Sequence, residues 1–243
     1  MIPYFLNKFS NKIDGVIHVG AHHGLEIIHY RKFTFEKIIF FEPIKDIFDE
    51  LIQNVKDEKN VECHNFGLGS SNDNKIIYKS TGNQGKSSSV LSPDVHLKVQ
   101  PNISFDDTEE ILIKRFDSLG MSTLNFLVID VQGFELEVLK GFGEELEKVE
   151  FIFTEINTKY LYEDNALVED IDRYLEKYDF VRVFTNIDCF THYGDAFYVK
   201  STNDKYRITF FSQLSNKVNI SNYYLYLKRV IYPKKILKRI IKK

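Results

Sequence analysis

Residues 16–42 are VIHVGAHHGLEIIHYRKFTFEKIIFFE. This stretch predicts a short apolar strand that ends at Gly20, a tight turn to Gly24, a helix, and a second apolar strand that ends on Glu42. Two parallel strands around one helix, with glycines in the first turn and an acid after the second strand, are typical of a nucleoside-binding unit. The glycines let the backbone approach a ligand closely, and the Glu42 carboxylate can accept hydrogen bonds from both ribose hydroxyls. The alternative is an ordinary strand–helix–strand turn that an acid follows by chance.

The turn also indicates which nucleoside binds. A dinucleotide site favours Gly-x-Gly-x-x-Gly, because a pyrophosphate sits on the helix N-terminus. Residues 20–24, Gly-Ala-His-His-Gly, have no third glycine at that spacing. A wider turn favours a ligand without phosphates, and S-adenosylmethionine, an adenosine joined to an amino acid, is such a ligand. We therefore predict S-adenosylmethionine as the cofactor.

Composition and length predict one ordered α/β domain with a sizeable core, since 43% of the 243 residues are hydrophobic and 28% are charged. Cys63 and Cys189 have no metal-binding or redox spacing, so reduced thiols in a cytoplasmic protein are expected. The first residues lack the long apolar run of a signal peptide. No segment has the roughly 20 apolar residues that a membrane-spanning helix needs.

The net charge of −3 conceals an asymmetry. From Ser221 onward the chain has eight Lys or Arg and no acid, so subtracting +8 from −3 leaves −11 for residues 1–220. The acidic body disfavours a nucleic-acid partner. The basic, partly apolar tail allows peripheral contact with the inner, anionic membrane face, although docking of this tail as a terminal helix is slightly favoured. The alternative is a terminal helix that docks on its own domain or on a second copy of the chain in a homodimer.

The remaining chain alternates strand and helix patterns. Strands are expected at 61–66, 75–79, 111–115, 124–130, 150–155, 180–184 and 196–199, and helices at 45–55, 134–140 and 166–177. A turn is expected at 67–74 and a long loop at 80–108. This order predicts an α/β fold with a mainly parallel seven-stranded sheet, helices on both faces and an antiparallel edge hairpin. We expect one domain over residues 1–203 and a basic extension over 204–243.

Three acids follow predicted strands, namely Glu42, Asp130 and Glu155. Ligands of open α/β sheets bind beyond the carboxyl ends of the strands, and an unpaired buried acid is costly, so these acids are candidate site residues. Asp130 could instead cap the helix that follows it. Asp130, Glu155 and Asn157 offer oxygen ligands to a hard cation, but no spacing requires a metal, and none is expected.

The ordered motifs in residues 13–200 resemble those of the FkbM family of methyltransferases. They are VIHVGAHHG (16–24), FFEP (40–43), NFGLGSSND (65–73), SSSVL (87–91), RFDSL (115–119), VIDVQGFE (128–135), VLKG (138–141), TEIN (154–157) and GDAFYV (194–199). The resemblance implies a class I Rossmann-like methyltransferase fold, S-adenosylmethionine as donor, and mostly O-methylation, frequently of sugars in glycans or natural products. Many members have Asp, Asn and Glu where His18, His22 and Gln132 stand, which leaves the cofactor unchanged and the acceptor harder to identify.

The resemblance assigns roles to residues. His18, Gly20, Ala21, His22 and Gly24 surround the methionyl part of the donor, Glu42 and Pro43 hold the ribose, and Gly67 and Leu68 lie by the adenine. Asp130 lies beside the methyl group, where it binds the donor's amino group, orients the acceptor or acts as base. Ser87, Ser88, Gln132 and Asn157 are expected to bind a sugar or glycan acceptor. For the proton acceptor the candidates include Glu155 and the histidines His18, His22, His23, His96 and His192, of which His96 is favoured because the long loop could close over the acceptor.

Three other functions stay open. An NAD-dependent epimerase or reductase acting on sugars is disfavoured by the missing third glycine. A methyltransferase-like subunit without activity could bind a partner through the basic tail. A nucleic-acid methyltransferase is disfavoured by the acidic body and by the absence of an Asn/Asp-Pro-Pro-Tyr/Phe motif.

Overall fold

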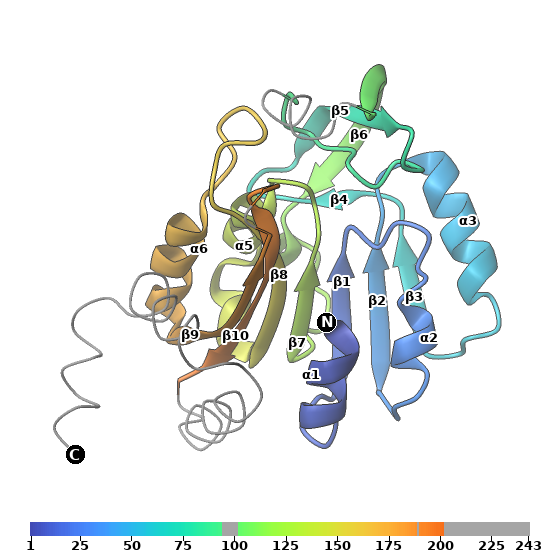
Figure 1. Cartoon of the computed structure of the whole chain (residues 1–243). Helices are drawn as coiled ribbons and strands as arrows, with labels where there is room; N and C mark the ends of the chain where they lie inside the picture. The colour runs from blue at the N-terminus through green and yellow to red at the C-terminus, as the bar shows by residue number, and fades with distance from the viewer. Residues whose placement is uncertain (94–101, 189, 202–243) are drawn as a thin grey trace, which may run out of the picture.

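Seven strands form the main sheet, in the order β3-β2-β1-β7-β8-β10-β9 (Figure 1). Their bounds are β1 Gly15–Val19, β2 Lys37–Phe41, β3 Val61–His64, β7 Phe126–Ile129, β8 Phe151–Asn157, β9 Phe180–Ile187 and β10 Tyr193–Lys200. The five strands from β3 to β8 pair in parallel, and β10 pairs antiparallel with β8 and β9. The predicted seven-stranded sheet with an antiparallel edge hairpin is confirmed.

The structure is a computed structural model that describes residues 1–93, 102–188 and 190–201. Three expectations from the sequence lie outside these residues. They concern His96 as proton acceptor, Cys189 as a reduced thiol, and the basic extension at 204–243.

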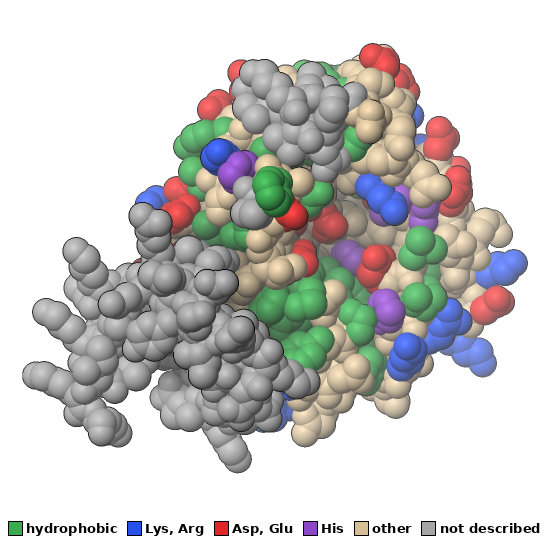
Figure 2. All heavy atoms as spheres, viewed as in Figure 1, with side chains coloured by type: hydrophobic (Ala, Val, Ile, Leu, Met, Phe, Trp, Pro, Cys, Tyr) green, Lys and Arg blue, Asp and Glu red, His purple; other side chains and the backbone are tan. Residues whose placement is uncertain are grey.

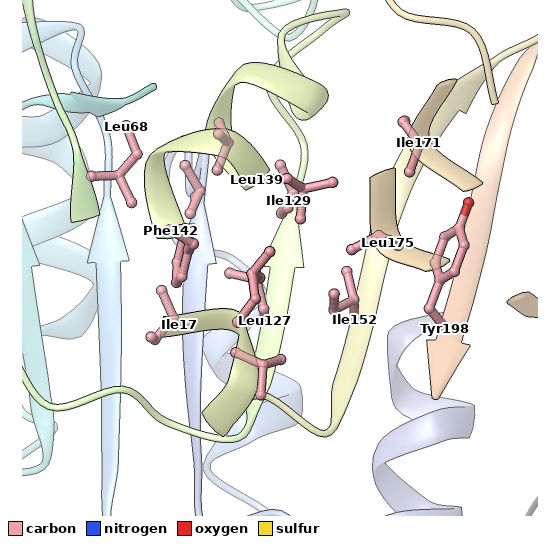
Figure 3. Close-up of a cluster of buried hydrophobic side chains, with 14 of the residues drawn as sticks. Ile17, Leu68, Leu127, Ile129, Leu139, Phe142, Ile152, Ile171, Leu175 and Tyr198 are labelled. Carbon is pink, nitrogen blue, oxygen red and sulfur yellow. The ribbon is translucent and has the colours of Figure 1, made fainter. Parts of the chain in front are cut away.

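Helices cover both faces of the main sheet (Figure 1). Their bounds are α1 Ile2–Phe9, α2 Ile27–Tyr30, α3 Lys45–Val55, α5 Glu135–Phe142 and α6 Val168–Leu175, with 3-10 turns η1 Phe116–Ser118, η2 Gly143–Lys148 and η3 Glu176–Tyr178. Because side chains alternate along a strand, each strand contributes side chains to two hydrophobic cores, one on each face of the sheet. Ile17 and Leu127 pack with α5 and α6 (Figure 3), whereas Val16 and Val128 pack with α1, α2 and α3.

Helix α1 was not predicted from the sequence. It buries Phe5, Leu6 and Phe9 against the sheet. The ring of Phe5 stacks on that of Phe197 with centroids 4.0 Å apart, and Phe9 lies 5.0 Å from Phe151. The neighbouring strands β8 and β10 are therefore covered by an aromatic layer that comes from the first turns of the chain.

A second, three-stranded sheet has the order β4-β6-β5, with β4 at Gly67–Leu68, β5 at Asp73–Thr81 and β6 at Ser104–Lys114. It corrects parts of two predictions, because 67–68 and 73–74 of the expected turn and 80–81 and 104–108 of the expected loop belong to strands. The strands expected at 75–79 and 111–115 lie largely within the long antiparallel pair of β5 and β6. Buried Ile77, Ile111 and Ile113 cover one face. The rest of β6 is rich in acids and mostly solvent-accessible, so apolar and polar residues alternate only weakly along this part of the sequence.

Helix α2 is shorter than the pattern after Gly24 indicates, with a single turn at Ile27–Tyr30. The other predicted helices are present, each within two or three residues of its expected bounds. In the residues that the structure describes, we find no helix with the length and apolar character needed to cross a bilayer.

Candidate functional site

The carboxyl ends of β1, β2, β7 and β8 meet along one edge of the main sheet, below the small sheet (Figure 1). The strand order reverses between β1 and β7, and such a switch point is where open α/β sheets bind ligands. A cavity of about 490 Å³ lies there, within the size range of small-molecule sites. Figure 2 shows acidic and histidine side chains gathered in this hollow.

The turn after β1 brings backbone to the cavity wall. The amides of Gly20 and Ala21 both donate to the Phe41 carbonyl oxygen at 3.0 Å, which ties this turn to the end of β2. Gly20 has a φ of +78°, and a Cβ there would lie 1.8 Å from the Asp130 carbonyl oxygen. Only glycine fits between the ends of β1 and β7, so this residue fixes how closely the two strands approach.

Gly24 does not line the cavity, in contrast to the prediction that it contacts the cofactor. Its φ is +66°, and a Cβ there would lie 2.2 Å from Cδ1 of Leu51. The residue is a glycine because α3 packs against the turn. It therefore shapes the loop from behind rather than forming its inner surface.

Glu42 is 5% exposed and lines the cavity at the end of β2. Its Oε2 accepts the His22 amide and its Oε1 accepts the Ile44 amide, each at 2.9 Å. Burial raises the pKa of the Glu42 carboxyl to about 7, while the two backbone hydrogen bonds oppose that rise. Each oxygen retains a lone pair for a further donor, so the carboxyl can still receive two hydroxyl groups.

An apolar wall adjoins Glu42. Ile44 contributes to it from the turn after β2, and the small sheet adds Leu68, Ile77, Ile111 and Ile113. Pro43 and Gly67 also line this part. A flat, aromatic group fits such a wall, and the three isoleucines of the small sheet were not predicted as site residues.

His18 lines the cavity but is 3% exposed. Its Nδ1 lies 3.0 Å from the hydroxyl oxygen of buried Tyr30. Burial lowers the pKa of His18, against the opposing effects of Glu26 and Asp130. The imidazole is therefore neutral near pH 7.

His22 stands at the mouth, with a φ of +50°. Its Nε2 donates to the Gln84 carbonyl oxygen at 2.7 Å. Burial lowers the pKa of His22 as well. His23 lines the cavity and forms an ion pair with Glu50 at 3.2 Å, whereas His192 does not line it.

The polar end of the cavity holds Asp130 and Glu155. One amide nitrogen, Nε2 of Gln132, donates to Asp130 Oδ1 at 2.7 Å and to Glu155 Oε2 at 2.6 Å. Gln132 has a φ of +54°, a conformation that few non-glycine residues adopt. Burial, and then the negative charge of Asp130, raise the pKa of Glu155 well above its ordinary value. The two acids and the amide thus form one hydrogen-bonded group, named here the acid pair (Asp130 and Glu155) and its bridge (Gln132).

Two loops cover this group. The hydroxyl of Tyr162 lies 3.2 Å from Gln132 Oε1 and 3.2 Å from the Ser87 carbonyl oxygen. The Ser89 hydroxyl donates to the Gln132 carbonyl oxygen at 2.7 Å. Tyr162 and Ser89 were not predicted as site residues, because neither follows a strand and no motif marks Tyr162.

Most predicted site residues line this one cavity. They are His18, Gly20, Ala21, His22, Glu42, Pro43, Gly67, Leu68, Ser87, Ser88, Asp130, Gln132 and Glu155. Asn157 does not: it is 0% exposed, and neither polar atom of its side chain has a hydrogen-bond partner in the described part of the chain. Asn157 lies two residues beyond Glu155 on the same face of β8 but outside the cavity lining, so its predicted contact with an acceptor is not visible in this geometry.

Comparisons with known proteins give the site a context. The protein 2-O-methyltransferase NoeI of Sinorhizobium fredii (strain NBRC 101917 / NGR234) is 30% identical over 102 residues, which are 40% of this chain and 42% of NoeI. The structure of methyltransferase FkbM from Methylobacillus flagellatus KT aligns with a TM-score of 0.52 at 16% identity, over 77% of this chain and 43% of that protein. Each match therefore spans less than half of the other protein's length.

The fold is that of class I methyltransferases, and the family follows from the sequence match. The model of the methyltransferase FkbM domain matches residues 18–182, which include every cavity-lining strand end described above. Because this match covers more than half of the chain, the chain belongs to the FkbM methyltransferase family.

Proposed function

We propose that this protein transfers a methyl group from S-adenosylmethionine to a hydroxyl group of a sugar. One observation carries the proposal: Glu42, the glycine turn and an apolar wall border a single cavity at the switch point of the sheet. This set matches the parts of the donor, because a carboxyl suits ribose hydroxyls and an apolar wall suits adenine.

The chain's own residues account for donor binding. Glu42 would accept the two ribose hydroxyls, while Leu68 and the small-sheet isoleucines would contact the adenine. The turn at Gly20 leaves room for the methionyl part, and the acid pair lies at the same polar end of the cavity. Carboxylates favour the positive charges of an ammonium and a sulfonium group.

The donor, when bound, supplies an electrophilic methyl group, and a hydroxyl acceptor must give up one proton as the methyl ether forms. The acid pair offers carboxylate oxygens for that proton, and the bridging amide of Gln132 holds them in place. Tyr162, Ser87 and Ser89 border the cavity at this end, where hydroxyls and carbonyls can bind a polyol. The histidine candidates are less suited, because His18 and His22 already bond to Tyr30 and Gln84.

A sugar acceptor is supported by two facts. The lining of the polar end consists of carboxyl, amide and hydroxyl groups, which pair with the many hydroxyls of a sugar. The relative NoeI is a 2-O-methyltransferase by name. The alternative with NAD as cofactor has no comparable support, because the turn after β1 lacks the third glycine.

Calorimetry with the purified protein tests the donor. We expect S-adenosylmethionine to bind and NAD⁺ not to bind. Glu42→Gln should weaken binding by roughly tenfold or more, since a hydrogen bond to a charged group is worth about 1.5–3 kcal/mol. Glu110→Gln, an exposed acid on β6 outside the cavity, is the matched control and should bind normally. Binding of NAD⁺ alone would overturn the proposal.

A further inference from the structure

The acid pair places the carboxyl group of Glu155 beside that of Asp130. Asp130 and Glu155 each accept a hydrogen bond from the same Gln132 nitrogen, at 2.7 and 2.6 Å. Two carboxyl groups held by one small donor are close enough for strong repulsion if both are charged. The amide oxygen of Gln132 faces the Tyr162 hydroxyl at 3.2 Å, so the amide cannot rotate away without losing that partner. The geometry therefore favours one negative charge for the two acids.

The charges around the pair add to this preference. Glu135 at the start of α5 and Asp195 on β10 both raise the pKa of Glu155 through their negative charges. Glu135 is itself fully buried, and its Oε1 accepts the Val131 and Gly133 amides. On the β1 side the nearest titratable group is His18, whose pKa is lowered by burial.

Positive charge is scarce at this end of the cavity. Among the described residues that line the cavity, Lys86 is the single Lys or Arg, and it lies in the loop after β5, near His22. Tyr162 presents a hydroxyl whose pKa is far above its ordinary value because of burial. In the free protein, then, a proton is the group that offsets the repulsion between the two acids.

We infer that Glu155, which Gln132 holds beside Asp130, carries a proton in the free protein and releases it to solvent when a sulfonium group binds, so that donor binding creates the base. The inference rests on the proposed function, since it takes the sulfonium of S-adenosylmethionine as the charge that replaces the proton. Gln132 and Tyr162 are the positioning residues, because they hold the two carboxyl groups without contacting the acceptor's reacting atoms.

The charges balance in this scheme. One proton leaves the pair as one positive charge enters the cavity, and the pair changes from one negative charge to two. A carboxylate is then available to take the proton of the acceptor hydroxyl. S-adenosylhomocysteine lacks the sulfonium charge, so its binding leaves the proton on Glu155. The protein would therefore carry a working base chiefly while it holds the methyl donor.

The test compares proton release on binding the two ligands. Calorimetry is run at pH 6.5 in buffers of different ionisation enthalpy, with S-adenosylmethionine and with S-adenosylhomocysteine. A bound positive charge stabilises the carboxylate form, so we expect S-adenosylmethionine to release up to about one proton more per site than S-adenosylhomocysteine. Its affinity should also rise with pH, by up to about tenfold per pH unit, more steeply than that of S-adenosylhomocysteine. Changes at Glu42 are common to both ligands and cancel in the difference.

Variants identify the source of the proton. Glu155→Gln should abolish the excess release, and Asp130→Asn should do the same if the first variant does not fold. Gln132→Glu adds a third carboxyl and should raise the pH at which the excess release is largest. Glu110→Gln is the matched control and should release protons as the unmodified chain does.

Three results would overturn the inference. Equal proton release with the two ligands, both binding to the unmodified chain, would refute it and leave the proposed function intact. The same holds if the excess persists in both Glu155→Gln and Asp130→Asn. If neither ligand binds to the unmodified chain, the proposed function fails, and this inference with it.

Discussion

Glu42 combines a structural role with a binding role. Its two oxygens hold the His22 and Ile44 amides and so fix the turns that follow β1 and β2. The same carboxyl faces the cavity. The sequence indicated the binding role because an acid directly after a buried strand is conspicuous. The hydrogen bonds from the two backbone amides were not predicted, because they depend on how the two turns meet in space.

The buried state of Glu42 predicts a pH-dependent stability. Its pKa is raised from 4.5 to about 7, so the folded protein binds more protons than the unfolded chain between these values. The contribution of Glu42 to stability therefore falls as pH rises from about 4.5 to above 7. Relative to Glu42→Gln, the unmodified protein should lose about 2 kcal/mol of unfolding free energy between pH 5 and pH 8. Urea denaturation of both proteins at the two pH values measures this. A constant difference would show that Glu42 is not buried as described.

The acid pair shows where prediction from the sequence ends at the scale of residues. Asp130 and Glu155 were predicted because each follows a buried strand, and Gln132 because of its motif. Tyr162 was not predicted, since it lies in a loop with no periodicity and meets Gln132 from 30 positions away. Hydrogen bonds across loops depend on the folded path of the chain, and neighbouring residues do not determine them.

Most strands and helices whose apolar residues form a clear pattern were predicted well, and those with a weak pattern were predicted less well. The buried strand β7 and the helices α3 and α6 have clear apolar patterns and lie close to where the sequence indicated. The pair β5 and β6 was predicted only in part, as short strands at 75–79 and 111–115, because one of its faces is exposed and many of its residues are charged. Helix α1 was not predicted, although it is as long as α6 and buries Phe5, Leu6 and Phe9.

Helix α1 should be important for stability despite its length. Phe5 is fully buried and stacks on Phe197, whereas its neighbour Tyr4 is 42% exposed. Phe5→Ala should lower the unfolding free energy by about 3–5 kcal/mol, because it leaves a cavity in the aromatic layer over β8 and β10. Urea denaturation measures the loss. Tyr4→Ala, the matched control, should cost less than about 1 kcal/mol. Similar losses in the two variants would mean that α1 does not dock as described.

At the scale of the whole molecule, the cavity arises where two sheets meet. The main sheet supplies the strand ends and the polar groups, while the small sheet supplies the isoleucines of the apolar wall. The sequence indicated the first half of this arrangement through the pattern of residues 16–42. The second half depends on the packing of β5 and β6 over the switch point, which no local pattern determines. Membrane contact through the basic residues after Ser221 stays a prediction.

A structure of the protein with S-adenosylhomocysteine tests the central claim most directly. The claim predicts the ribose hydroxyls within hydrogen-bond distance of Glu42, the adenine against Leu68, Ile111 and Ile113, and the amino acid part toward Gly20 and Asp130. A ligand bound elsewhere on the molecule, or a Glu42 side chain that makes no contact with the ribose, would contradict it.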